Sequence, residues 1–199
     1  MDMMFQVRIH GRGGQGVVTA AEMLSIAAFR ENRHAQAFPS FGSERTGAPV
    51  VAFCRMDTRE IRSREPVMQP DAVVIQDATL LHQVDVFSGL APDGYLLINT
   101  ARDLALLGLT DFVRGRDASR IATVNATEIA LTHVGRPLPN AALLGAFAAL
   151  TGQISIDSVV AAIHDTFGGK VGEGNAAAAR AAYEHVRSEL GERVHAEAD

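Results

Sequence analysis

A glycine-rich loop between an apolar strand and an apolar helix constrains this chain more than any other feature. The loop Gly11-Arg12-Gly13-Gly14-Gln15-Gly16 follows a strand-like segment at residues 5–10 and precedes an apolar run at residues 17–29. Glycines let a ligand approach the backbone closely, and the first N–H groups of the helix, at its positive end, then point at a bound anion. The sequence therefore predicts a phosphate site at the start of this helix.

The same glycines match the G-x-G-x-x-G fingerprint of dinucleotide-binding proteins, which also requires an acidic residue about 20 positions further on. We expect the second strand at residues 34–38, and the first acid after it is Glu44, within a loop. Glu31 comes too early, and no Gly-Lys-Ser/Thr follows the glycines as in a P-loop. These departures argue against the prediction of an NAD site and favour a phosphate site. A tight turn that binds nothing is the structural alternative.

Composition is that of an ordinary globular protein. The chain has 199 residues, 47% of them hydrophobic and 21% charged, with a net charge of −5. We expect a single domain at residues 1–193 followed by a loose tail at residues 194–199. The negative charge does not favour nucleic-acid binding, and no apolar run approaches the ~20 residues of a membrane span. The N-terminus lacks signal-peptide character, so we expect a cytoplasmic protein.

Cysteine and histidine usage restricts the chemistry of the chain. Cys54 is the single cysteine and lies in an apolar strand, where a buried, unreactive thiol is expected. One cysteine cannot hold an iron–sulfur cluster. The seven histidines show no metal-binding spacing, and His10, beside the glycine loop, is expected to cap a strand end. With no catalytic nucleophile–base pair visible, we expect the isolated chain to be colourless and inactive.

Strands and helices alternate, which predicts an α/β fold: a mostly parallel, Rossmann-like sheet flanked by helices in three layers. We expect strands at residues 5–10, 34–38, 50–56, 72–76, 95–99 and 121–124, and helices at 14–32, 77–87, 129–134, 140–150 and 158–167. Asn125 is expected near a helix start.

The last third of the chain changes character. The helix at residues 140–150 is apolar nearly all round, so it should be buried or lie at a subunit interface. Residues 168–174 contain four glycines and are expected to form a flexible link. Asn175 is then expected to cap a final helix.

A second unusual loop lies at residues 38–48, between two apolar strands. It contains Ser43, Glu44, Arg45 and Thr46 between two glycines. A guanidinium group with neighbouring hydroxyls and backbone amides binds phosphate well. In a parallel sheet the loops after successive strands lie along one edge, so we expect this loop to meet the glycine loop. A turn held only by surface contacts is the alternative.

Together the two loops resemble those of the gamma subunit of 2-oxoacid:ferredoxin oxidoreductases, the pyruvate/ketoisovalerate family. The resemblance extends in order over nearly the whole chain. Its motifs are residues 11–21, 39–47, 71–74, Pro139-Asn140, 144–146 and 170–175. One departure is Thr46-Gly47-Ala48, where many members have Arg-Gly-Gly.

The resemblance implies a fold like domain III of the single-chain pyruvate:ferredoxin oxidoreductases and a role in decarboxylating a 2-oxoacid to acyl-CoA. Thiamine diphosphate, Mg and iron–sulfur clusters would lie on partner alpha, beta and delta subunits, and electrons would pass to ferredoxin or to an NAD-reducing partner. Coenzyme A would be the co-substrate that this chain helps to bind. By residue match, the binding candidates are Gly11, Gly13, Gly14, Gln15, Gly16, Ser43, Glu44, Arg45 and Thr46.

Two other function classes stay open at this point. One is a stand-alone NAD(P)-dependent dehydrogenase, and the other is a nucleotide-binding regulatory module. The missing acid after the second strand argues against the first of these. The sequence also leaves open the oxoacid, the final electron acceptor and the stoichiometry of a complex.

Overall fold

The computed structural model describes residues 4–40 and 46–196, which form an α/β fold around a six-stranded sheet. The strands are β1 (Phe5–Arg12), β2 (His34–Pro39), β3 (Pro49–Asp57), β4 (Ala72–Ile75), β5 (Tyr95–Asn99) and β6 (Ile121–Val124), in the spatial order β2-β3-β1-β4-β5-β6. Only β3 runs against its neighbours. The expected mostly parallel sheet is confirmed.

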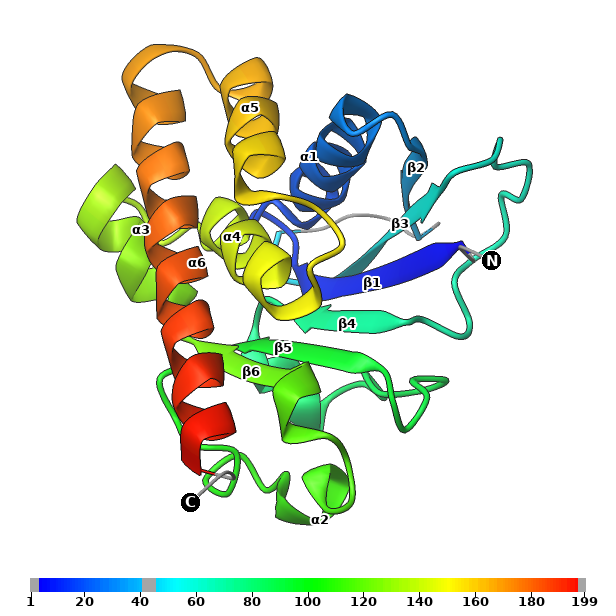
Figure 1. Ribbon diagram of the computed structural model, residues 1–199, viewed down its shortest axis with the longest axis vertical. Coiled ribbons are helices and arrows are strands. Elements are labelled where there is room, and N and C mark those ends of the chain that lie inside the picture. Colours follow the sequence, from blue (N-terminus) through cyan, green and yellow to red (C-terminus); the bar gives the residue numbers. More distant parts are fainter. Residues whose placement is uncertain (1–3, 41–45, 197–199) are drawn as a thin grey trace.

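The helices divide unequally between the two faces of the sheet (Figure 1). The longer ones are α1 (Val17–Arg30), α3 (Ala126–Val134), α4 (Asn140–Thr151), α5 (Ile156–Thr166) and α6 (Gly169–Ala196). They share one core with the apolar residues on one face of the sheet. The other face is covered by the 3-10 helix η1 (Ala78–His82), the short helix α2 (Thr110–Val113) and the adjoining loops, around a smaller core. The 3-10 helix η2 (Ala118–Arg120) precedes β6 and contacts α4.

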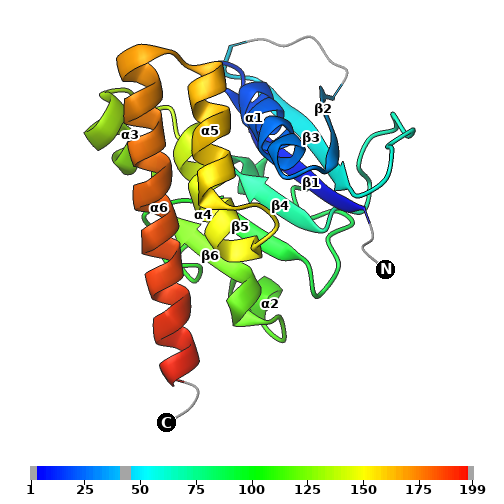
Figure 2. The same cartoon turned by 45° about the horizontal axis from the view of Figure 1, so that its top comes forward.

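Helix α4 lies at the centre of the helical layer, with α5 and α6 outside it (Figure 2). It contacts α1, α3, α5 and α6 as well as strands β5 and β6. All of its residues except Ala149 are buried. Of the two expected outcomes for this apolar helix, burial inside the chain is correct. The expectation that it forms a contact with partner subunits is wrong, because α6 already covers it.

The glycine-rich segment at residues 168–174 is not a flexible link. Helix α6 starts at Gly169 and continues through these glycines, and it reaches Ala196. Asn175 is therefore inside the helix and caps nothing; its side-chain Nδ2 donates to the carbonyl oxygen of Val171. A side chain at Gly174 would come within 2.7 Å of the carbonyl oxygen of His133. Gly174 therefore allows α6 to lie close to the end of α3.

Other local expectations had mixed outcomes. Asn125 accepts a hydrogen bond from the backbone N–H of Glu128, so the expected helix start is confirmed. The helix expected at residues 77–87 is only the short η1, capped by the side chain of Asp77. Cys54 is fully buried, and burial raises the pKa of its thiol to about 12. Within the described residues, no helix is long and apolar enough to cross a bilayer.

Candidate functional site

The glycine loop joins the end of β1 to the start of α1. Gly14 and Gly16 have φ angles of 89° and 72°, in the left-handed region that favours glycine. Gly16 is the residue before α1, and no side chain caps that helix. The first-turn N–H groups of α1 are therefore left without a capping acceptor, which is the arrangement that binds anions at helix starts.

The second loop meets the glycine loop, as expected from the sheet. Thr46 pairs with Gly13 in a parallel bridge. The N–H of Gly47 donates to the carbonyl oxygen of Gly13 at 3.0 Å, and the N–H of Gly13 donates to the carbonyl oxygen of Ala48 at 2.9 Å. Three candidates from this loop, Ser43, Glu44 and Arg45, lie outside the described residues.

Arg12 holds this meeting point together. Its Nε lies 3.2 Å from Oδ2 of Asp77, and its two terminal nitrogens donate to the carbonyl oxygen of Gly47 and to the side chains of Thr79 and Gln83. The Arg12 and Asp77 side chains are 21% and 15% exposed, so the ion pair is well shielded. Neither Arg12 nor Asp77 was identified from the sequence as a residue that shapes the site. A charged residue between the loop glycines was the only available signal.

Gln15 uses its side chain within the protein. Its Oε1 accepts from the N–H of Arg12 at 2.8 Å, and its Nε2 donates to Oδ2 of Asp77 at 2.9 Å. Gln76 donates to the backbone carbonyl of Gln15. Burial opposes ionisation of Asp77, but hydrogen bonds from Thr79 and Gln15 and the charge of Arg12 outweigh it and lower the pKa of this carboxyl. Gln15 therefore shapes the loop.

The backbone donors of the loop fall into two groups. The N–H groups of Gly13 and Gln15 are used within the loops. The N–H groups of Gly14 and Gly16 donate to none of the described residues. Gly11 lies inside β1, and a side chain there would overlap Val17. Gly14 and Gly16 are thus the loop positions best placed to bind a ligand.

A cavity of about 480 Å³ opens beside these two glycines. It is lined by Gly14, Gly16, Thr19, Val134, Arg136, Leu138, Asn140, Phe167, Val171 and Asn175. These residues come from the glycine loop and from α1, α3, α4 and α6 with the turns between them. The sequence motifs containing Asn140 and Asn175 were noticed, but nothing in the sequence placed them beside the glycine loop.

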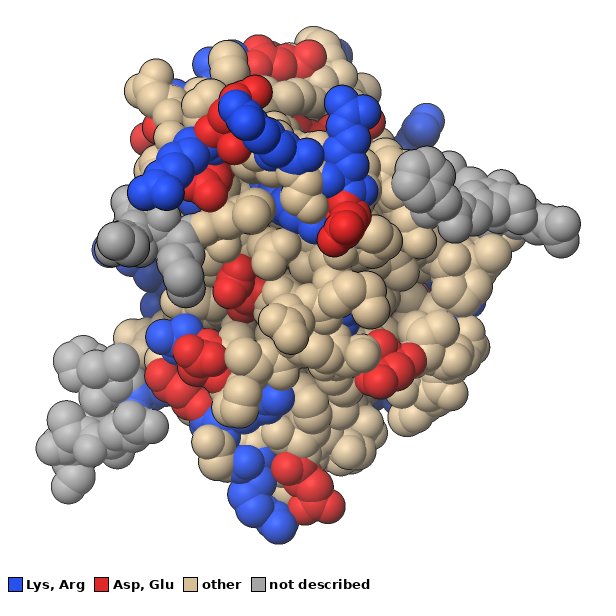
Figure 3. All heavy atoms as spheres, turned by 90° about the vertical axis from the view of Figure 1, so that its right-hand side faces the viewer, with Lys and Arg blue, Asp and Glu red and all other residues tan. Residues whose placement is uncertain are grey.

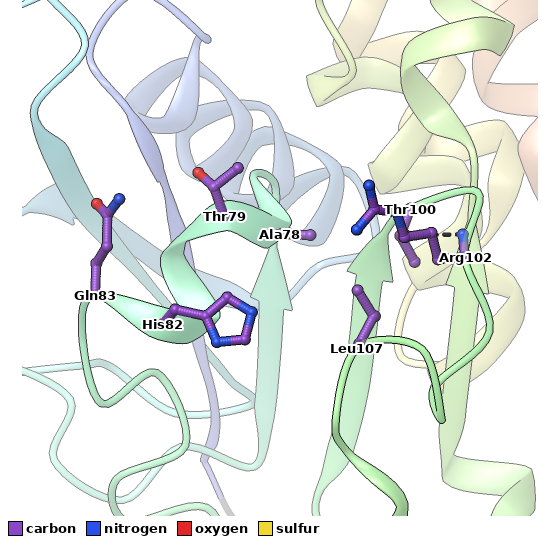
Figure 4. Close-up of a pocket in the computed structure, with 7 residues that line it drawn as sticks. All are labelled: Ala78, Thr79, His82, Gln83, Thr100, Arg102 and Leu107. Carbon is purple, nitrogen blue, oxygen red and sulfur yellow. Dashed lines mark hydrogen bonds between the residues drawn. The ribbon is translucent and has the colours of Figure 1, made fainter.

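A second cavity, of about 380 Å³, lies between η1 and the loop after β5 (Figure 4). His82 and Leu107 line it from opposite sides, and the N–H of Arg102 donates to the hydroxyl of Thr100 at 3.0 Å. Two of its polar side chains, Thr79 and Gln83, already bind Arg12. Unlike the first cavity, this one is not lined by the glycine loop.

His10 lies within β1 and is 5% exposed. Its Nε2 accepts a hydrogen bond from Nε of Arg8 at 3.0 Å, and its Nδ1 has no partner among the described residues. Burial, and then the charge of Arg8, lower the pKa of His10 to about 4. The side chain is therefore neutral near pH 7 and packs beside Arg8. Within residues 4–40 and 46–196, no three His, Cys, Asp or Glu side chains are grouped to hold a metal ion.

Comparison with known proteins gives one consistent result. Residues 6–185 match the family model described as "Pyruvate ferredoxin/flavodoxin oxidoreductase". The chain is 50% identical to pyruvate synthase subunit PorC of Methanothermobacter marburgensis, over 92% of this chain and 98% of that protein. It is 49% identical to the pyruvate/ketoisovalerate oxidoreductases common subunit gamma of Pyrococcus abyssi, over 92% and 98% of the two chains.

A solved structure agrees with these sequence relatives. The crystal structure of pyruvate oxidoreductase subunit PORC from Thermotoga maritima superposes with a TM-score of 0.75 at 38% identity. The match covers 91% of this chain and 96% of that one. The similarity therefore extends over most of both chains.

Proposed function

Because the chain belongs to the pyruvate ferredoxin/flavodoxin oxidoreductase family, we propose that it is the gamma subunit of an enzyme that oxidatively decarboxylates a 2-oxoacid to an acyl-CoA. Its relatives carry the names of subunits, including one common to pyruvate and ketoisovalerate oxidoreductases. Those names support a place in a complex over a stand-alone NAD(P)-dependent dehydrogenase. The chain alone is expected to be inactive.

Within this complex the chain helps to bind coenzyme A at the two loops. The observation that carries this proposal is the pairing of Thr46 with Gly13. This pairing brings the end of the second loop, just before β3, against the glycine loop. Arg45 directly precedes Thr46 in the sequence. Guanidinium and backbone N–H groups together form charge-assisted hydrogen bonds to phosphate.

The proposed contacts divide into two roles. The N–H groups of Gly14 and Gly16, with those of the first turn of α1, are free to donate to a phosphate oxygen. Gly13 and Gln15 hold the loops in position through bonds inside the protein. Ser43, Glu44, Arg45 and Thr46 complete the proposed site from the second loop.

The cofactors of the reaction are proposed to lie on partner subunits. Cys54 is the single cysteine and is fully buried in β3, so this chain does not provide the thiolate ligands that an iron–sulfur cluster needs. We place thiamine diphosphate, Mg and the clusters on alpha, beta and delta subunits in the cytoplasm, with ferredoxin or an NAD-reducing partner as acceptor.

One face of the molecule is compatible with contacts to such partners. In Figure 3, side chains of both charge signs are intermixed near the top and bottom of this face, and its middle is mostly free of charged residues. Interface centres are typically depleted in charged residues. Because α4 is covered within the chain, any such contact uses surface residues and not that helix.

The substitution Arg45→Ala in the assembled enzyme tests the coenzyme A proposal. Loss of a charge-assisted hydrogen bond costs on the order of 1.5–3 kcal/mol, so the apparent KM for coenzyme A should rise roughly ten- to a hundred-fold. Decarboxylation of the 2-oxoacid before coenzyme A reacts should change little. Steady-state kinetics and single-turnover decarboxylation, measured on one preparation, separate the two effects.

The matched control is Arg64→Ala, which removes an exposed arginine from the loop after β3. It should leave both half-reactions unchanged. If Arg45→Ala instead weakens assembly and leaves the dependence on coenzyme A unaltered, Arg45 is a structural residue and the proposed contact is wrong.

A further inference from the structure

The cavity beside Gly14 and Gly16 is built from parts of the chain that are far apart in sequence. The glycine loop, the turn between α3 and α4, and the start of α6 all contribute lining residues. The four helices around it lie on the same side of the sheet (Figures 1 and 2). None of the described residues of the second loop lines it. The contacts of Thr46 and Arg12 do not account for this cavity.

One end of the cavity is suited to an anion. Gly16 precedes the 14-residue helix α1, and no side chain caps it. Thr19, in the first turn of α1, lines the cavity and adds a hydroxyl group. Arg136 lines it from the turn after α3, is exposed, and its guanidinium makes no hydrogen bond or ion pair with the described residues. The helix dipole and this cation both favour a phosphate group here.

The amide side chain of Asn175 provides a second, independent observation. Asn140 and Asn175 line the cavity, and each is only 5% exposed. Nδ2 of Asn175 donates to the carbonyl oxygen of Val171 at 2.9 Å, and this bond identifies the nitrogen. The amide oxygen of Asn175 accepts from none of the described residues. This oxygen is not among the fully buried unpaired atoms, so it keeps accessible surface where Asn175 lines the cavity, and an N–H or O–H group of a ligand can donate to it.

The remaining lining is apolar. Val134, Leu138, Phe167 and Val171 form the rest of the wall. A flat ring could pack against Phe167 while its edge reaches the amide oxygen of Asn175, since the amide group of Asn140 is already bonded to Gly16 and Ala141. The volume of about 480 Å³ is within the range of roughly 300–1,000 Å³ that small-molecule sites occupy.

We propose that this cavity binds a nucleotide. The phosphate lies at the start of α1 beside Arg136, and the heterocycle lies against Phe167 with its polar edge at Asn175. A nucleotide phosphate of this kind has two sources, the adenosine phosphate end of coenzyme A or a free nucleotide. If coenzyme A is the occupant, the inference rests on the proposed function and assigns the nucleotide end of that substrate to this cavity.

The test measures binding of adenosine 3′,5′-bisphosphate and of ADP to the assembled complex by titration calorimetry. Arg136→Glu reverses the charge at an exposed position, so it should not disturb folding, and it should weaken binding of at least one probe about tenfold or more. The control Arg62→Glu changes an arginine whose side chain is 86% exposed and should leave binding unchanged. Equal affinities of the wild type and Arg136→Glu for both probes would overturn the proposal.

Asn175→Ala tests whether the heterocycle of the nucleotide contacts Asn175. It should weaken binding of both nucleotides while leaving binding of inorganic phosphate unchanged. If it weakens phosphate and nucleotide binding equally, or neither, the placement of the heterocycle at Asn175 is wrong. Thermal unfolding of each variant checks that the fold is intact.

Competition then identifies the source of the nucleotide. ADP that raises the apparent KM for coenzyme A in the wild type and not in Arg136→Glu identifies the cavity as part of the coenzyme A site. ADP that binds without changing this KM identifies a free nucleotide as the occupant, and the proposed coenzyme A site is then confined to the second loop, without the N–H groups of Gly14, Gly16 and α1. Because the coenzyme A proposal is tested independently by Arg45→Ala, each proposal can fail while the other stands.

Discussion

Two glycine-rich parts of this protein have opposite structural roles. At the loop of residues 11–16, no side chain caps the first N–H groups of α1. Gly14 and Gly16 adopt left-handed conformations there. Gly174, in the first turns of α6, and Gly145 of α4 instead lie where a side chain would overlap the backbone of a neighbouring helix. Glycine content alone does not distinguish a ligand loop from a close helix contact.

The two regions also differ in what stabilises them. The loop is held by polar contacts, chiefly the bonds that Arg12 and Gln15 make with Asp77. The helices are held by apolar packing, in which α4 and α6 make the most extensive contact between any two elements. Substitutions should therefore affect function first in the loop and stability first in the helices.

The largest expected effect is at the helix contact. A methyl group at Gly145 would overlap the carbonyl oxygen of Ala179 in α6. Because a backbone group cannot move aside as a flexible side chain can, Gly145→Ala should lower the free energy of unfolding by about 3 kcal/mol. Urea unfolding monitored by circular dichroism measures this value.

Gly191→Ala is the matched control, since Gly191 also lies in a helix but has open space around it. It should raise the free energy of unfolding by roughly 0.5–1 kcal/mol, because alanine loses less backbone entropy than glycine in a helix. Equal effects of the two substitutions would contradict the close contact of α4 with α6.

An intermediate effect is expected in the glycine loop. Gly16→Ala imposes a left-handed conformation on alanine, which costs roughly 1–2 kcal/mol. The added methyl would also come within 2.6 Å of Nδ2 of Asn140, so this side chain must shift. Unfolding experiments together with the apparent KM for coenzyme A in the assembled enzyme measure both consequences.

Gly152→Ala is the control for the stability lost by placing alanine in a left-handed backbone conformation. Gly152 ends α4 with a φ of 61° and has nothing within 4 Å of the added methyl. It should lose similar stability without any change in the KM for coenzyme A. A Gly16→Ala enzyme that behaves like Gly152→Ala in both measurements would remove the loop from the proposed binding site.

The smallest effect is expected at Asp77. Asp77→Asn removes the negative partner of Arg12 and should cost about 1 kcal/mol at pH 7. The pKa of Asp77 is lowered in the folded protein, so its carboxylate stabilises the fold above the ordinary Asp pKa of about 3.9. That contribution is lost as the pH falls through the lowered value. The stability difference between wild type and variant should therefore vanish in strong acid.

Unfolding measured between pH 7 and pH 2 tests this pH dependence. Asp111→Asn is the control, because the Asp111 side chain is 88% exposed in its pair with Arg114 and should contribute little. A difference between wild type and Asp77→Asn that grows as the pH falls would show that the Arg12–Asp77 pair does not stabilise the loop.

Much of the fold could be predicted because the signals are local. Strands such as β4 are continuous apolar runs, and Asn125 is a side chain that caps a helix within its own turn. The errors came where contacts distant in sequence override local preference. The sequence predicts a flexible link at residues 168–174 because glycine disfavours helix. In the structure α6 nevertheless begins there, packed against the end of α3 and against α4.

The sequence by itself determined the α/β class, the glycine loop before α1, the family, and the presence of a single cysteine, too few for a cluster on this chain. Each depends on residue type and order alone. Only the tertiary structure decided that Thr46 pairs with Gly13, that Gln15 is occupied by Asp77, and that Asn140 and Asn175 line a cavity beside Gly16. These contacts join residues 33 to 159 positions apart. The pairing of β1 with β3 and β4 brings the first two together, and the packing of α4 and α6 beside α1 brings the third.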